Sequence, residues 1–166
     1  MMRFVFFLMV LTMVVACKKD KALNGIDAEL FEMAEQTSGF TWYKNSDALL
    51  PKSSGSGHEH PFLRTRFNSV AATQLNSEGK IAANAVFPQG SLVVKELVNE
   101  DESLGRYAIL YKASGNENAD ANGWVWGYID ADKKVVSSAE KKGASCINCH
   151  QQSGSIDYML MNKFFP

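Results

Sequence analysis

One short motif near the C-terminal end of the 166-residue chain, Cys146-Ile147-Asn148-Cys149-His150, limits what the chain can fold around. The spacing Cys-x-x-Cys-His is typical of the attachment site of a c-type haem. In one helical turn the two thiols reach the two vinyl groups of a porphyrin, and each thiol adds across one vinyl double bond to form a thioether. His150 then lies beneath the iron as its ligand. We therefore expect haem c as the cofactor, attached through Cys146 and Cys149.

Two other chemistries use paired cysteines, and the sequence leaves both open. A zinc site would combine the metal-binding side chains of the motif with His58 or His60, but no second ligand pair stands at the usual zinc-binding spacing. A thioredoxin-like redox pair belongs early in a βαβ unit. Here the motif instead follows a polar run, residues 137–145, close to the end of the chain. The order of the residues favours haem.

The first residues are typical of an export signal and not of a folded domain. Arg3 precedes an apolar segment, residues 4–15, that is too short to cross a bilayer. Val14-Val15-Ala16-Cys17 then resembles a bacterial lipobox. We expect acylated Cys17 to begin the mature protein and to anchor it by lipid alone, facing the periplasm or the cell surface. An ordinary signal peptide with an incidental cysteine is the alternative.

The length predicts one folded domain after this signal. We expect a signal peptide over residues 1–16, a lipidated tether with a short helix over 17–38, and a haem domain over 39–166. The net charge is −1, so no basic field favours nucleic acid as a partner.

The hydrophobic pattern predicts an α+β fold that is predominantly β, an antiparallel sheet with a few short helices and a C-terminal haem-attachment segment. Apolar residues at helical spacing predict a helix over residues 26–37. Asn68 is suited to cap a second short helix. The remaining elements are strands at 41–44, 62–67, 91–98, 106–113 and 124–129, and helices at 70–75 and 156–163.

Several short sequences occur in an order that, together with the haem motif, resembles the cytochrome P-460 family. They are Arg64-x-Arg66-Phe67-Asn68, Phe87-Pro88-Gln89-Gly90 with Lys95-Glu96 in the strand that follows, Tyr111-Lys112, Trp124-Val125-Trp126 and Asp157-Tyr158. The family includes the β-sheet cytochromes c′, or cytochrome c′-beta. The resemblance extends from about residue 42 to residue 158, which is most of the mature chain.

The resemblance implies a sheet-rich homodimer with one five-coordinate haem c per chain. Some family members bind nitric oxide or carbon monoxide in a pocket capped by phenylalanine, and Phe62, Phe67 and Phe87 are the candidates here. Other members oxidise hydroxylamine and carry a lysine cross-linked to the porphyrin, for which Lys80 is the candidate. Each of these residues also has an ordinary interpretation, as a core phenylalanine or a solvated turn lysine.

The second axial position of the iron decides between three functions. A gas-binding module leaves it open for a small ligand, and we expect that function first. An oxidase needs a polar group there, for which Arg64, Arg66, Glu96 and Glu100 are available, although salt bridges or propionate contacts suit strand residues better.

A simple electron carrier with a redox partner protein would instead fill the second axial position with a protein ligand. His58 and His60 follow a glycine- and serine-rich loop and are candidates, although loop histidines are usually solvated. Met159 and Met161 follow His150 so closely that core packing is the better interpretation of both.

Overall fold

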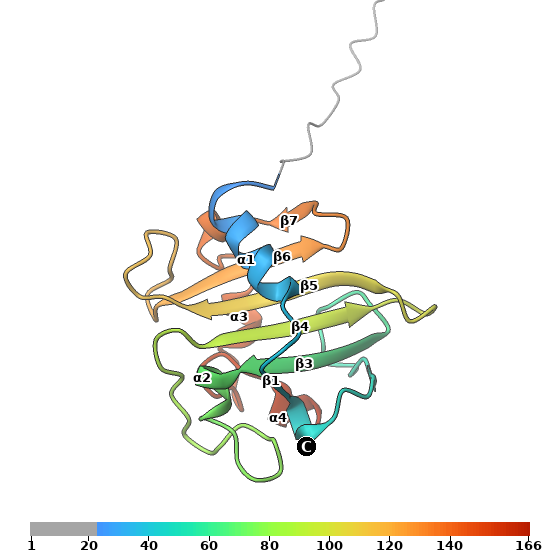
Figure 1. Cartoon of the computed structure of the whole chain (residues 1–166). Coiled ribbons are helices and arrows are strands. Elements are labelled where there is room, and N and C mark those ends of the chain that lie inside the picture. The colour runs from blue at the N-terminus through green and yellow to red at the C-terminus, as the bar shows by residue number, and fades with distance from the viewer. Residues whose placement is uncertain (1–22) are drawn as a thin grey trace, which may run out of the picture.

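The computed structural model describes residues 23–166, so the predicted export signal and Cys17 lie outside the described residues. The body is one antiparallel sheet of seven strands, with helices on both of its faces (Figure 1). This confirms the predicted class. The strands are β1 (Phe40–Trp42), β2 (Leu50–Pro51), β3 (Phe62–Asn68), β4 (Leu92–Val98), β5 (Leu104–Lys112), β6 (Trp124–Asp130) and β7 (Val135–Ser137). The helices are α1 (Gly25–Glu35), α2 (Ser69–Ala72), α3 (Ile147–His150) and α4 (Met161–Phe164), with 3-10 turns η1 (Tyr43–Asn45) and η2 (Ala139–Lys141).

The strands follow one another across the sheet in the order β1-β3-β4-β5-β6-β7, with β2 also paired to β3. Every pairing is antiparallel, and the register aligns residues in rows across the four central strands. One row holds Thr65, Lys95, Ala108 and Tyr128. Because side chains of a row share one face of the sheet, these four residues point to the same side.

Helix α1 covers the other face of the sheet, in front of the strands in Figure 1. Its buried residues Leu30, Phe31 and Ala34 pack in one core cluster with apolar residues of β4, β5 and β6. Gly127 makes room for the helix, because a Cβ atom there would lie 3.0 Å from Leu30 Cδ1. The buried carboxylate of Asp27 accepts a hydrogen bond from the Ala139 N–H at 2.8 Å and ties α1 to η2.

A buried ion pair lies between α1 and the sheet. Arg66 is completely buried and pairs with Glu96, which is 5% exposed. The Arg66 guanidinium also donates to the carbonyl oxygen of Ala34 in the last turns of α1. Arg64 adds a second ion pair to the same carboxylate. The cluster therefore joins β3, β4 and α1.

The C-terminal segment packs against the opposite face, where α3 and α4 lie behind the sheet (Figure 1). The predicted helix over residues 156–163 is wrong. Ile156 and Met159 form an isolated antiparallel bridge instead, and only Met161–Phe164 is helical. Asp157 and Tyr158 have φ of +44° and +69°, which no right-handed helix contains. The predicted cap of α2 is confirmed, since the Asn68 side chain accepts a hydrogen bond from the Ala71 N–H.

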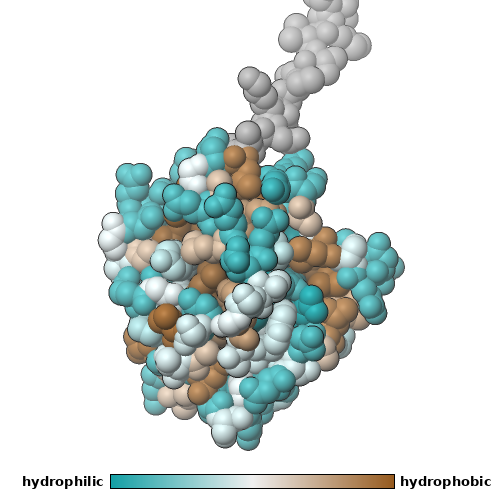
Figure 2. All heavy atoms as spheres, in the orientation of Figure 1, coloured by the Kyte–Doolittle hydropathy of each residue, from teal (hydrophilic) through white to brown (hydrophobic). Residues whose placement is uncertain are grey.

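Hydrophilic and hydrophobic side chains intermingle on the face that α1 covers (Figure 2). Val86 and Val136 are the large hydrophobic residues that residues 23–166 expose to solvent. Isolated valines are ordinary on a protein surface, so the homodimer stays a prediction from the resemblance. Among the described helices, none has both the length and the apolar character needed to cross a membrane.

The buried ion pair gives a first testable prediction. Glu96→Gln removes the charge that compensates the completely buried Arg66, and we expect the free energy of unfolding to fall by about 3–5 kcal/mol. Urea unfolding followed by circular dichroism measures the change. Glu78→Gln is the matched control, because the Glu78–Lys80 pair is largely exposed and its loss costs less than about 1 kcal/mol. Equal effects of the two substitutions would contradict this account.

Candidate haem site

The motif Cys146–His150 forms the single helical turn that haem attachment requires. The backbone N–H groups of Cys149 and His150 both donate to the carbonyl oxygen of Cys146 at 3.1 Å. Gly143 lets this turn approach β6, because a Cβ atom there would lie 2.7 Å from the indole of Trp126. The φ of Gly143, +71°, also favours glycine at this position. Cys146 is half-buried and Cys149 is exposed, and both line the mouth of one cavity.

The imidazole of His150 is held in the orientation of a metal ligand. Its Nδ1 lies 2.7 Å from the carbonyl oxygen of Tyr158. A carbonyl only accepts, so Nδ1 carries the proton and Nε2 keeps a free lone pair. The ring packs edge-on against Trp126, with centroids 5.2 Å apart. Burial, and next the positive charge of Lys95, lowers the pKa of His150 to about 4, so the ring is neutral at neutral pH.

Asp157 positions the segment that supplies the Tyr158 carbonyl. Its carboxylate accepts hydrogen bonds from the Trp124 indole N–H and from the Phe87 backbone N–H, both at 2.9 Å. Lys112 completes the arrangement with an ion pair at 3.3 Å. The C-terminal segment is thereby tied to two strands and to the turn before β4. Asp157 stood out in the sequence as part of the resemblance, and the contacts it makes with residues far away in the chain show how it positions this segment.

The cavity lies between the sheet and the C-terminal segment and has a volume of about 250 Å³. One wall is the row of Thr65, Lys95, Ala108 and Tyr128, with Val93, Leu110 and Trp126 beside it. The other walls are the haem motif, residues 159–165 and the loop of residues 55–58. No aspartate, glutamate or arginine is among the described residues that line it.

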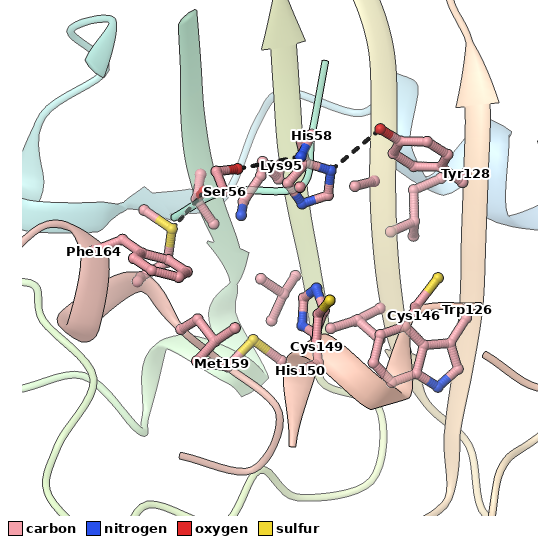
Figure 3. A pocket seen from close by; sticks show the side chains of 18 of the residues that line it. Ser56, His58, Lys95, Trp126, Tyr128, Cys146, Cys149, His150, Met159 and Phe164 are labelled. Carbon is pink, nitrogen blue, oxygen red and sulfur yellow. Dashed lines mark hydrogen bonds between the residues drawn. The ribbon is translucent and has the colours of Figure 1, made fainter. Parts of the chain in front are cut away.

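Among the described residues that line the cavity, Lys95 is the one that carries a primary amine. Its side chain points into the cavity (Figure 3). Strand alternation sends the side chain of the next residue, Glu96, to the α1 side, where it pairs with Arg66. No hydrogen-bond or ion-pair partner of the amine occurs within residues 23–166. Burial lowers the pKa of Lys95 to about 8, so part of the amine is unprotonated at neutral pH.

His58 faces His150 across the cavity (Figure 3). The ring centroids are 6.3 Å apart and the ring planes are inclined by 77°. His58 Nδ1 lies 3.2 Å from the Tyr128 hydroxyl. Burial, and next the charge of Lys95, lowers the pKa of His58 to about 2. His60 lies elsewhere: it lines a separate surface hollow and packs against Gly105.

The candidate phenylalanines, the charged strand candidates, Glu100 and Lys80 do not line the cavity. Phe67 and Phe87 stack on each other in the core, with centroids 6.3 Å apart, and Phe62 lies at the start of β3. The charged candidates Arg64, Arg66 and Glu96 form the ion-pair cluster on the α1 face. Glu100 is exposed in the turn after β4. Lys80 pairs with Glu78 at 3.1 Å in another turn.

The residues present fit a haem. A neutral imidazole points a lone pair into the cavity, two thiols stand at its mouth within one helical turn, and most of the wall is apolar. His150 would hold the iron, and Cys146 and Cys149 would hold the porphyrin edge. Within residues 23–166, no group of three or more His, Cys, Asp or Glu side chains is arranged to bind a metal ion by itself.

The sequence match agrees with this geometry. Residues 41–161 match the Cytochrome P460 family, and this match covers most of the chain. The protein is thus a haem-binding cytochrome, and it belongs to the cytochrome P460 family. No curated protein and no solved structure matched the chain.

The ion pair and hydrogen bonds of Asp157 predict a loss of stability when its charge is removed. Asp157→Asn leaves the nearly buried Lys112 without its counter-charge, and we expect the free energy of unfolding to fall by about 3 kcal/mol. Asp47→Asn, at an exposed position, should change it by less than about 0.5 kcal/mol. Urea unfolding of both variants makes the comparison. A loss no larger than that of the control would remove Asp157 from this role.

Proposed function

We propose that this protein is a c-type cytochrome that carries one haem, bonded through thioethers to Cys146 and Cys149 and ligated by His150, and that it exchanges single electrons with a partner protein. The main support for this proposal is that these three side chains lie on one helical turn and line the same cavity. When bound, haem supplies an iron that alternates between the ferrous and ferric states. The protein residues attach it, orient it and exclude water from it.

The exposure of the two cysteines supports electron exchange. Cys149 is exposed and Cys146 is half-buried, so the bonded porphyrin edge would lie near solvent, where a partner protein can approach. The walls away from this edge consist mainly of apolar side chains such as Val93 and Leu110. A carboxylate base for oxidative chemistry is missing from the described lining of the cavity. This arrangement suits electron transfer better than turnover of a substrate.

Export and anchoring belong to the same proposal. The apolar segment before Cys17 and the lipobox-like residues 14–17 support acylation at Cys17 and placement on the outer side of a bacterial membrane. Thioether attachment of haem takes place on that side, so the two features agree. The lipid would be the only membrane contact.

Hydroxylamine oxidation is a second candidate, because one observation favours it. The lysine that the cavity offers is Lys95 and not Lys80. An unprotonated amine beside a bound porphyrin is a nucleophile. A cross-link would replace one porphyrin C–H bond and one N–H bond by a C–N bond, releasing two protons and two electrons, so it would need a two-electron oxidant such as a peroxide. Binding of nitric oxide or carbon monoxide at an open iron ranks lower, since the three candidate phenylalanines lie outside the cavity lining.

The attachment is tested on denaturing gels stained for haem. Wild-type protein should keep its haem after denaturation, and Cys146→Ala or Cys149→Ala should each keep it through one thioether. The double variant should lose it completely. Cys17→Ala is the control, and it should retain covalent haem while moving from the membrane to the soluble fraction. A double variant that still retains haem would contradict thioether attachment.

The mass of the haem peptide separates the two candidate functions. An electron carrier should give a peptide containing Cys146–His150 and haem alone, and Lys95→Met should leave its mass and the optical spectrum unchanged. A cross-linked enzyme should give a larger product that includes the peptide around Lys95. Lys80→Met is the matched control, because Lys80 lies away from the cavity.

A further inference from the structure

The two histidines of the cavity are spaced as a pair of ligands to one metal ion. A metal–imidazole bond is about 2.0 Å long and the ring centre lies about 1.1 Å beyond the nitrogen, so one ion between opposed imidazoles places the ring centres about 6.2 Å apart. The centroids of His58 and His150 are 6.3 Å apart. We propose that His58 is the second axial ligand of the haem iron, opposite His150. This inference rests on the proposed haem attachment.

Hydrogen bonding leaves the same nitrogen free in both rings. Nδ1 of His150 donates to the Tyr158 carbonyl, and Nδ1 of His58 lies 3.2 Å from the Tyr128 hydroxyl. A hydroxyl can accept as well as donate, so the tautomer of His58 that donates through Nδ1 has its Nε2 available as a ligand, as His150 has. In Figure 3 the two rings lie on opposite sides of the cavity and face one another. A partner on the outer nitrogen of a ligating histidine fixes its orientation and its tautomer, and both rings have one.

Contacts from two directions hold His58 in place. Its ring packs against Tyr128 with centroids 5.7 Å apart, and the Arg106 guanidinium covers that tyrosine at 4.6 Å from the ring centre. The loop that carries His58 is closed by a hydrogen bond from the Lys52 N–H to the Pro61 carbonyl at 2.7 Å. The His58 N–H also donates to the Ser56 hydroxyl at 3.3 Å. The loop thus presents His58 as a fixed part of the cavity wall.

Other side chains of the chain are less suited to this position. His60 lines a different hollow. Met159 follows the motif on the same side of the cavity as His150, as Figure 3 shows, and Met161 receives a hydrogen bond from the Thr65 hydroxyl. Lys95 is the remaining competitor, since its amine points into the cavity. The experiment therefore has to separate His58 from Lys95.

The choice of ligand has a consequence for function. With imidazoles on both sides the iron has no open position, so a small gas molecule can bind only after His58 leaves. Two nitrogen ligands that stay in place in both oxidation states favour rapid electron exchange. The inferred ligand pair therefore supports electron transfer, and not gas binding, as the function of this family member.

Optical and electron paramagnetic resonance spectra of the haem-loaded full chain test the assignment. Wild-type protein should be low-spin in both oxidation states, and carbon monoxide should not shift the ferrous spectrum. His58→Ala should lose the low-spin signal and bind carbon monoxide. Added imidazole should restore the low-spin spectrum of this variant. The controls His60→Ala and Lys95→Met should resemble the wild type.

The spectra distinguish a wrong ligand assignment from a wrong proposed function. Covalent haem with a high-spin wild-type spectrum that His58→Ala leaves unchanged would overturn the ligand assignment and leave the proposed function standing. A change of spin state in Lys95→Met alone would overturn it in favour of the amine. Absence of covalent haem in the wild type would overturn the proposed function itself.

A measurement on wild-type protein alone guards against a variant that does not fold. Labelling all histidines with ¹⁵N and recording hyperfine couplings in the low-spin ferric state counts the histidine nitrogens bound to iron. We expect two, and a count of one overturns the inference.

Discussion

The pleat of the four central strands is the constraint on which the rest of the structure depends. Successive side chains alternate between two faces, so each strand serves two different structures at once. In β4, Lys95 faces the haem cavity and Glu96 completes the buried ion pair beneath α1. A slip of one residue in this strand would exchange the two, placing a carboxylate in the cavity and an amine against Arg66. The buried ion pair on one face thereby holds the register of the site on the other.

The sequence predicted the sheet well, because strand signals are local. Alternating and β-branched residues marked β3 to β6, and helical spacing marked α1 to within two residues at each end. The closing helix over residues 156–163 was predicted wrongly for a physical reason: its apolar residues suit a helix, but Asp157 and Tyr158 adopt left-handed backbone angles, and Asp157 bonds distant partners. Tertiary contacts decided that segment, and single-sequence patterns do not contain them.

The site divides in the same way. Cys146, Cys149 and His150 could be proposed from the sequence because they lie within five consecutive residues at a characteristic spacing. The groups that face them arrive through strand register and loop closure, which spacing along the chain does not disclose. Lys80 and Lys95 illustrate the point: both lie near the Phe-Pro turn in sequence, yet one pairs with Glu78 in a surface turn and the other enters the cavity. His58 looked like a loop residue and became interpretable only with Tyr128 beside it.

The position of the haem motif within the topology also divides the walls of the cavity between two parts of the chain. Every strand of the sheet precedes Cys146 in the chain, and neighbours in sequence are neighbours in the sheet from β3 to β7. The whole wall that the sheet contributes to the cavity is therefore encoded before the two thiols. The segment that follows His150 supplies the last wall, including Met161 and Phe164. On the proposed attachment, the bonded edge of the haem would lie where the segment that closes the cavity meets the wall formed by the sheet.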